Sequence, residues 1–168
     1  GLSAIMAAKI AGAGKIIAVD LHPHRLQLAK ELGADAVFSA ESGNVNEKIK
    51  DILPEGTNFS LDTTAVASVM LDAIDILAPR GTFGFVTSPS NGKDLPIPMR
   101  SLMKGCKIIG ISEGNSNPEV FIPRLIDFYM EGKFPFDRLI KFYPFDQIAQ
   151  TFHDSETGAS IKPILRFD

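Results

Sequence analysis

The sequence predicts an α/β protein with a doubly wound, parallel sheet that carries helices on both faces. Two observations lead to this fold class. Short, β-branched strand segments alternate with helical segments up to Ser112, and this rhythm is typical of parallel strands joined by right-handed crossovers. The composition, with 45% hydrophobic and 22% charged residues in 168, is that of an ordinary core-forming chain. Global disorder is therefore not expected.

The expected elements follow one another from the first residue. Residues 1–12 have apolar side chains at helical spacing and end in a glycine. Residues 15–20 (KIIAVD) are short and mostly apolar, as a buried parallel strand should be. Pro23 then opens a helix that Gly33 closes. The remaining elements alternate in the same way, with strands over 35–39, 59–63, 81–87 and 107–112, and helices over 45–53, 66–77 and 98–104. Pro54 is expected to end the helix over 45–53, and the Ala78–Pro79 pair the helix over 66–77.

The rhythm changes after Gly114. A longer helix over 118–132 is followed by a strand over 139–143, a helix over 145–153 and a final strand over 160–167. We therefore expect a sheet domain over residues 1–114 and a separate segment over 115–168. The chain has no initiator Met and starts inside an expected helix, so we interpret it as a fragment.

Charge and cysteine content exclude some classes of protein. The formal net charge is −3, which argues against a nucleic-acid binder, because such proteins normally carry a basic face. Cys106 stands alone, so no internal disulfide can form, and a reducing cytoplasmic setting is expected. No apolar run approaches the roughly 18 residues that span a bilayer, so no membrane partner is expected.

Asp20 is the most informative residue for function. It closes an expected strand and lies 19 positions after Gly1, which opens a helix. Dinucleotide-binding units place the pyrophosphate on such a helix start and hold the ribose hydroxyls with an acidic residue about 20 positions later. Gly1 would then be the third glycine of a GxGxxG turn. A carboxylate here repels a 2′-phosphate, so NAD is expected rather than NADP. The alternative is that Asp20 only caps the helix that begins at Pro23.

Several segments of the sequence resemble the corresponding segments of a known family. GLSAIMAAKIAGAGKIIAVDLHPHRLQLAKELGAD is similar to the cofactor half of zinc-type, medium-chain alcohol dehydrogenases, and SLDTTA, APRGTFGFVTSP, KIIGISEG and SIKPILRF follow in the family's order. GISEGNSNPEVFIPRLIDFYMEGKFPFDRLI resembles the aryl-alcohol (benzyl-alcohol) branch, which typically has Asp where Asn115 stands. The resemblance implies a C-terminal fragment of an oxidoreductase. Its fold would be a Rossmann-like sheet of order 3-2-1-4-5-6 without its first, central strand, followed by a segment that returns to the catalytic domain.

The resemblance also implies the roles of individual residues. Asp20 would hold the adenosine ribose with Arg25 beside it, and Lys162 stands where the family usually has an Arg for the pyrophosphate. A lysine keeps the positive charge but lacks the planar guanidinium with which an arginine can donate two parallel hydrogen bonds to a phosphate. The other implied cofactor-binding residues are Gly1, Thr64, Val86, Thr87, Ser88, Ile111, Ser112 and Glu113.

The chain offers no zinc site. In the family, zinc polarises the substrate oxygen before a hydride leaves for the nicotinamide. Such a zinc needs Cys and His ligands with one open position. This chain has Cys106, His22, His24 and His153, which are scattered and lack ligand spacing. We therefore expect zinc ligands outside this chain, no catalytic residue within it, and no turnover by the chain alone.

Further expectations concern assembly. The apolar strand over 107–112 is expected at a sheet edge, where it would pair with a second copy to give a dimer or tetramer. Apolar residues of the C-terminal segment are expected to lack part of their packing, notably Phe121, Phe128, Phe134, Phe136 and Phe142. The expected substrate is a small alcohol or aldehyde. Three alternatives stay open: a methyltransferase-like cofactor binder, a non-enzymatic nucleotide-binding module, and a zinc-free quinone-reductase relative, which would usually prefer NADPH.

Overall fold

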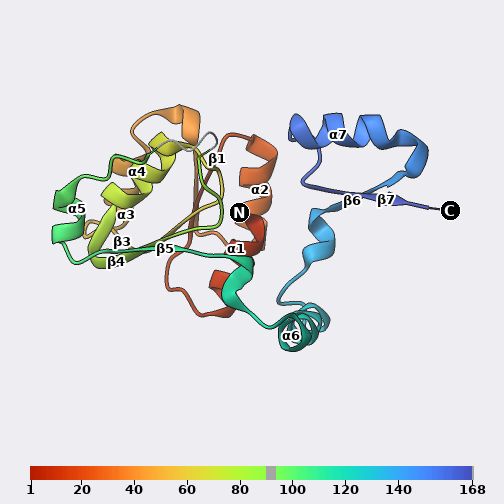
Figure 1. The fold of residues 1–168 in the computed structure, drawn as a ribbon, viewed down its shortest axis with the longest axis horizontal. Helices are drawn as coiled ribbons and strands as arrows, with labels where there is room; N and C mark the ends of the chain where they lie inside the picture. Colours follow the sequence, from red (N-terminus) through yellow and green to blue (C-terminus); the bar gives the residue numbers. More distant parts are fainter. Residues whose placement is uncertain (90–93, 168) are drawn as a thin grey trace.

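Three small parallel sheets form the framework of the molecule (Figure 1). The structure is a computed structural model that describes residues 1–89 and 94–167. In the first sheet β1 (Ile17–Asp20) pairs with β2 (Ala36–Ser39). The second has the order β3 (Thr57–Asp62), β4 (Leu77–Phe85), β5 (Lys107–Gly110), and in the third β6 (Ile140–Pro144) pairs with β7 (Lys162–Arg166). All the described strand pairs are parallel, so the predicted α/β class is confirmed.

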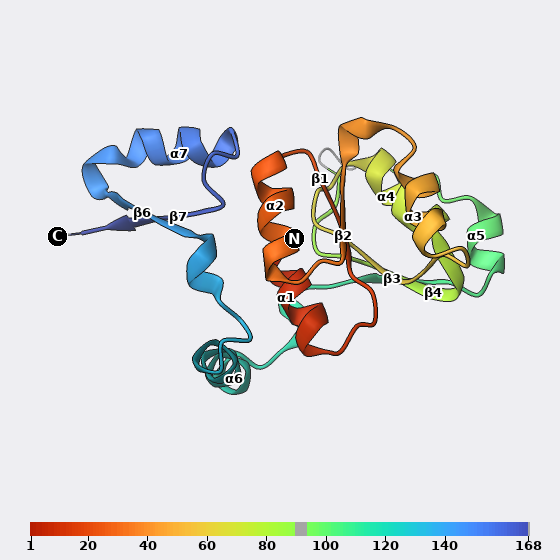
Figure 2. The same ribbon diagram turned by 180° about the vertical axis from the view of Figure 1, so that it is seen from behind.

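The helices cover the first two sheets from both sides. Figures 1 and 2 show α1 and α2 on one side of the strands and α3, α4 and α5 on the other. The described helices are α1 (Leu2–Ile10), α2 (Pro23–Leu32), α3 (Val45–Ile52), α4 (Ala67–Asp75), α5 (Met99–Met103), α6 (Pro118–Met130) and α7 (Ile148–Glu156). Four short 3-10 turns join them: η1 (Ala40–Ser42), η2 (Glu113–Asn115), η3 (Phe136–Leu139) and η4 (Phe145–Gln147).

Two hydrophobic cores hold these layers together. The first lies where α1 and α2 meet β1 and β2, around Met6 and Ala29. The second lies between α4 and β4, where Phe83 is completely buried against Met70 and Ile74. Each core uses one face of a helix and one face of a strand, as the apolar spacing predicts.

The sheet is interrupted between β1 and β3. β1 and β2 form one sheet, β3, β4 and β5 form another, and the described residues place no strand that joins the two. This is the position at which the 3-2-1-4-5-6 order has its first strand. On β3, Phe59 is 80% exposed and Leu61 is 45% exposed.

The predicted boundary between the helix over 66–77 and the next strand is wrong. α4 ends at Asp75, and Leu77, Ala78 and Pro79 already belong to β4. The Thr57 N–H donates to the Ile76 carbonyl at 3.0 Å, and Leu77 pairs with Thr57. Pro79 is tolerated because the register shifts between Thr57 and Phe59 at this point. The strand therefore begins at Leu77 and includes the buried residues Leu77 and Ala78, whereas it was expected to begin at Gly81.

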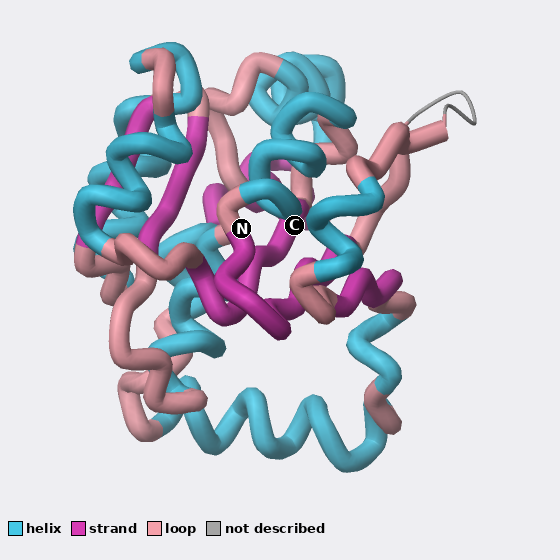
Figure 3. The backbone as a smooth tube through the Cα atoms, turned by 90° about the vertical axis from the view of Figure 1, so that its left-hand side faces the viewer, coloured by secondary structure: helices cyan, strands magenta, loops and turns pink. Residues whose placement is uncertain are grey.

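The segment after Gly114 is less buried than the sheets. Figure 3 shows α6 running apart from the strands, and none of its residues is buried. Phe121, Phe136 and Phe142 are 42%, 39% and 51% exposed, in line with the expected apolar surface. Phe128 and Phe134 are half-buried, and Phe134 packs against the first core. Within the described part of the chain, no helix combines the length and the apolar character that crossing a membrane requires.

Candidate functional site

The N-terminal end of α1 forms a positive helix end without a cap. The N-cap, Gly1, has no side chain that could cap the helix, none of the described side chains does so, and the first turn has no acidic residue. The first N–H groups of an α-helix have no intrahelical partner and carry the positive end of the helix dipole. This end of α1 is therefore suited to bind an anion through Leu2 and Ser3.

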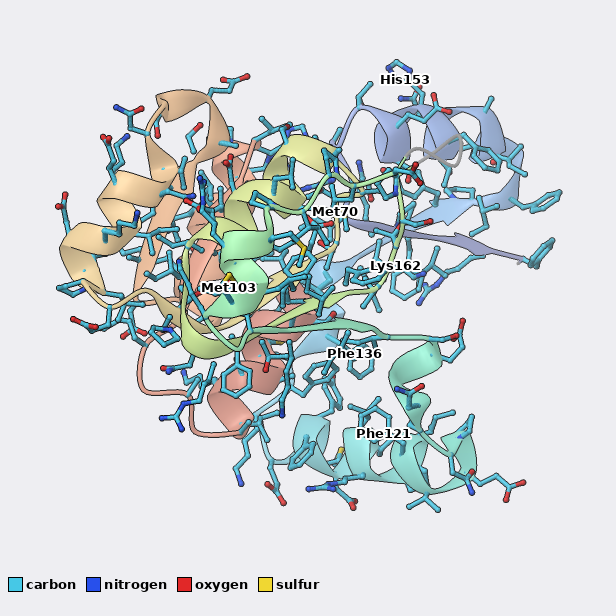
Figure 4. All side chains as sticks on the ribbon, turned by 60° about the vertical axis from the view of Figure 1, so that its left-hand side comes forward. Met70, Met103, Phe121, Phe136, His153 and Lys162 are labelled. Carbon is cyan, nitrogen blue, oxygen red and sulfur yellow. The ribbon has the colours of Figure 1, made fainter. Side chains whose placement is uncertain are left out.

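A hollow of about 430 Å³ opens beside this helix end. Three segments line it: the start of α1 (Gly1, Leu2, Ser3), the stretch around η3 and β6 (Phe136, Leu139, Ile140) and β7 with the residue before it (Ile161, Lys162, Ile164). Lys162 is the one charged residue in this lining. Figure 4 shows Lys162 in the middle of the molecule near Phe136, away from His153 on the outside of α7. A lysine and an uncapped helix start thus face the same space.

Asp20 lies at the carboxyl end of β1 and is half-buried. Its Oδ1 accepts the His22 N–H at 2.9 Å. The N-cap of α2 is His22, so Asp20 stabilises the turn that leads into the helix, as the alternative interpretation of this residue expected. The ribose-binding interpretation stays a prediction. Among the described residues, Oδ2 accepts no hydrogen bond. One carboxylate oxygen is therefore used by the fold, and the other is available to a ligand.

Arg25 lies near the start of α1. Together with Asp20 and Asp62, it is within electrostatic range of the Gly1 nitrogen. The Arg25 Nε is buried and has no hydrogen-bond partner in the described part of the chain. The structure thus brings Gly1, Asp20 and Arg25 together.

Asp62, at the end of β3, lies in the candidate site and is not among the residues expected from the sequence. It is only 3% exposed, and its Oδ1 accepts the N–H groups of Thr64 and Ala65, both at 3.0 Å. Its Oδ2 accepts the Thr64 hydroxyl at 2.8 Å, so this hydroxyl is tied into the loop. Asp followed by Thr-Thr after an apolar strand is the signal for this Asx turn. The adjacent Thr63 places its Oγ1 3.7 Å from where a Gly1 Cβ would stand, so this loop lies against α1.

The ends of β4 and β5 carry the remaining candidates. The Val86 N–H donates to the Asp62 carbonyl at 3.3 Å, and the Ile111 N–H donates to the Phe85 carbonyl at 2.9 Å. These bonds hold the two strand ends beside the end of β3. The other candidates lie in the same loops: Thr87 is half-buried, whereas Ser88, Ser112 and Glu113 are exposed. Ligands of open α/β sheets bind at this carboxyl edge.

The backbone after β5 turns sharply. Glu113, Gly114 and Asn115 have φ values of 47°, 67° and 48°. Two residues with a Cβ thus adopt the left-handed region, which is uncommon for such residues.

The donors for zinc are not assembled. Within residues 1–89 and 94–167, no three His, Cys, Asp or Glu side chains come together in a way that could hold a metal ion. Cys106 donates its thiol to the Ala78 carbonyl at 3.5 Å, and His22 and His24 lie against each other with ring centroids 5.6 Å apart. The residues present therefore do not fit a zinc ion.

Comparisons with known proteins place the chain in a family. The family described as zinc-binding dehydrogenase matches residues 1–131. The geraniol dehydrogenase of Castellaniella defragrans is 40% identical over 169 aligned positions, which cover 99% of this chain and 45% of that protein. The chain thus spans less than half the length of this relative.

Two solved structures are similar in fold and sequence. The alcohol dehydrogenase zinc-binding domain protein from Burkholderia ambifaria matches with a TM-score of 0.95 and 45% identity, over 99% of this chain and 45% of that one. The benzyl alcohol dehydrogenase from Acinetobacter calcoaceticus matches with a TM-score of 0.96 and 41% identity, over 100% of this chain and 47% of that one. Together with the family match over residues 1–131, these likenesses show that the chain belongs to the zinc-binding dehydrogenase family.

Proposed function

We propose that these 168 residues are the NAD-binding part of a zinc-dependent alcohol dehydrogenase. The whole enzyme would oxidise a primary alcohol to an aldehyde, with aromatic alcohols as candidates. The family match supports this, and two relatives are named for geraniol and benzyl alcohol, which are both primary alcohols. The observation that carries the proposal is the placement of two groups around the start of α1: Lys162 lines the hollow beside it, and Asp20, with one carboxylate oxygen free, lies within electrostatic range of Gly1.

The arrangement fits the parts of a dinucleotide. The N–H groups at the start of α1, next to Gly1, would hold the pyrophosphate together with Lys162. Asp20 would accept the hydroxyls of the adenosine ribose, with Arg25 beside it. The loop of Thr64 would line the groove. The nicotinamide end would lie along the candidates after β4 and β5, namely Val86, Thr87, Ser88, Ile111, Ser112 and Glu113.

The roles of this chain in the reaction would be binding and orientation. When bound, NAD supplies the acceptor for a hydride from the alcohol carbon. The strand ends would fix the nicotinamide against the substrate. The residues present do not fit zinc, so its ligands are proposed to lie outside these residues, and this chain alone would turn over nothing.

The same proposal covers organisation and setting. Residues 1–114 would form the cofactor domain, and residues 115–168 would pack with the catalytic domain. Subunits would associate as a dimer or tetramer through β5, which is the outer strand of its sheet. Cys106 as the single cysteine is in keeping with the cytoplasm.

The alternatives to an alcohol dehydrogenase are not favoured. A methyltransferase-like fold or a non-enzymatic nucleotide-binding module does not explain likeness to alcohol dehydrogenases over 99% of the chain. A zinc-free quinone reductase would usually take NADPH, and the carboxylate of Asp20 opposes a 2′-phosphate.

The test is the cofactor preference of the Asp20→Asn variant. Asparagine keeps an acceptor for the His22 N–H and removes the negative charge. The dissociation constants of NAD⁺ and NADP⁺ are measured by titration calorimetry. The wild type should prefer NAD⁺, and the variant should lose about tenfold of that preference, corresponding to about 1.4 kcal/mol.

The matched control is Asp51→Asn, which neutralises an exposed carboxylate on α3. It should leave the ratio of the two affinities as in the wild type. An unchanged ratio in Asp20→Asn, or a wild type that binds neither cofactor, would contradict the proposed function.

A further inference from the structure

The turn between α7 and β7 touches the start of α2. Gly158 in this turn is buried, although the residues on either side of it are exposed. A Cβ built on Gly158 would lie 2.7 Å from Nε2 and 2.9 Å from Cε1 of His22, and 3.2 Å from Nη2 of Arg25. Real Cβ atoms essentially never approach other atoms as closely as the two distances to His22, and the distance to Arg25 is tighter than most real contacts. The backbone of this turn therefore packs directly against the side chains of His22 and Arg25.

Gly158 is needed for more than its backbone conformation. Four of the described helices are followed, one residue after the C-cap, by a glycine in the left-handed region: Gly12 (φ 78°), Gly105 (φ 75°), Gly132 (φ 72°) and Gly158 (φ 76°). Such glycines are common because a Cβ is strained at this φ. A Cβ at Gly12 or Gly132 would meet nothing within 4 Å, whereas one at Gly158 would meet His22 and Arg25. Gly12 and Gly132 therefore serve as controls: alanine there has the same backbone strain as at Gly158 but no contact with His22 or Arg25.

The turn cannot easily yield, because its own backbone is fixed. The Gly158 N–H donates to the Ser155 carbonyl at 3.3 Å, and the Ser160 N–H donates to the Asp154 carbonyl at 2.9 Å. The atoms of His22 and Arg25 that would clash are at the far ends of flexible side chains. An added methyl group at 158 should therefore displace these two side chains while the fold stays intact.

The displaced side chains are coupled to the proposed cofactor site. His22 follows Asp20 by two residues and donates its backbone N–H to Asp20 Oδ1, and Arg25, which the proposed function places beside the adenosine ribose, lies within electrostatic range of the start of α1. The buried Nε of Arg25 has no hydrogen bond to hold it among the described residues. The backbone of Gly158 is a close packing neighbour of this guanidinium.

We infer that Gly158 is a positioning residue that holds His22 and Arg25 in place for the adenosine end of NAD. The inference rests on the proposed function, and it adds a residue from the C-terminal segment to the determinants of cofactor affinity. Gly158 acts through His22 and Arg25. Because it has no side chain, these two side chains can occupy the space next to its backbone. Its removal should weaken NAD⁺ binding and leave the reaction of the bound substrate unchanged.

The experiment compares Gly158→Ala with Gly132→Ala in the whole enzyme. Both variants carry the same strain of a left-handed alanine, so both should melt at similarly reduced temperatures. The dissociation constant and KM for NAD⁺ should rise about tenfold in Gly158→Ala and less than about twofold in Gly132→Ala. The KM for benzyl alcohol and kcat at saturating NAD⁺ should stay at the wild-type values in both. Equal NAD⁺ affinities in the two variants would overturn the inference.

A second pair of variants tests the contact itself. His22→Ala removes the imidazole and makes room for a methyl group at 158. The added loss of NAD⁺ affinity caused by Gly158→Ala should then be much smaller in the His22→Ala background than in the wild type. Fully additive effects would show that the contact is not the cause and would also overturn the inference. A wild type that does not bind NAD⁺ refutes the proposed function, whereas a wild type that binds it, with an unaffected Gly158→Ala, refutes the positioning role alone.

Discussion

At the scale of single residues, the site has charges of opposite sign at separate places. Asp20 presents one free carboxylate oxygen at the end of β1, while Lys162 faces the uncapped start of α1. An acid suits sugar hydroxyls and a cation suits phosphates, so the two ends match the two parts of a dinucleotide. Asp20 could be predicted from its distance to Gly1. Lys162 could be found only through the family resemblance, because it is brought to α1 by tertiary structure.

The role of Lys162 predicts a graded effect of substitution. Lys162→Gln removes the charge that faces the start of α1 and should weaken NAD⁺ binding about tenfold. Lys162→Arg restores a fork that can bind phosphate oxygens in two places, so it should bind NAD⁺ at least as tightly as the wild type. Titration calorimetry at fixed ionic strength measures both affinities. Lys133→Gln, which removes an exposed lysine paired with Glu131, is the control. If the Lys162→Gln variant binds NAD⁺ as tightly as the wild type, Lys162 does not take part in NAD⁺ binding.

At the scale of elements, a carboxylate ties α7 to β6. Asp154 on α7 accepts hydrogen bonds from the Tyr143 hydroxyl at 2.6 Å, from Gln150 Nε2 at 2.6 Å and from Lys141 Nζ at 3.2 Å. The Tyr143 hydrogen bond is the main reason that the pKa of Asp154 falls from 3.8 to about 2. Tyr143 is buried, so this bond anchors the helix to the strand that leads toward the hollow.

This anchor predicts a pH dependence of stability. Because the folded state lowers the pKa of Asp154, the anchor stabilises the fold fully above about pH 3.8 and is lost as the pH falls toward 2. Tyr143→Phe should lower the melting temperature by about 2–4 °C at pH 7, and this difference should shrink between pH 4 and 2. Thermal melts across this range provide the measurement. Tyr129→Phe, whose hydroxyl has no partner among the described residues, should change neither the melting temperature nor its pH dependence. A pH-independent effect of Tyr143→Phe would contradict the assignment.

Elements were easier to predict than the contacts between them. The helix over 23–32 has the predicted bounds because Pro23 and Gly33 define both ends locally. The start of β4 was misplaced because Leu77 joins the strand through pairing with Thr57, which is a non-local contact. The loop of Asp62 and the approach of Gly158 to His22 were missed for the same reason, since both depend on residues or conformations that periodicity does not report.

At the scale of the whole molecule, three sheet edges that bear on assembly have no partner strand among the described residues. The edges that face the interruption belong to β1 and β3, and the outer edge belongs to β5. On β5, Ile109 is 44% exposed. Exposed, apolar edges favour strand-to-strand association.

The β5 edge predicts association of subunits. Ile109→Lys places a charge on the proposed contact and should convert dimers or tetramers into smaller species at micromolar concentration. Sedimentation velocity measures the change. Ile52→Lys, which alters an isoleucine on α3 that is 37% exposed, should leave the assembly intact. A wild type that sediments as a monomer would contradict the role of β5.

The most direct test of the account is a crystal structure of the whole enzyme with NAD⁺. The account predicts that Asp20 Oδ2 lies about 2.6–3.2 Å from a hydroxyl of the adenosine ribose, with the pyrophosphate at the start of α1. A structure in which the cofactor is bound and the Asp20 side chain points away from the ribose would contradict it.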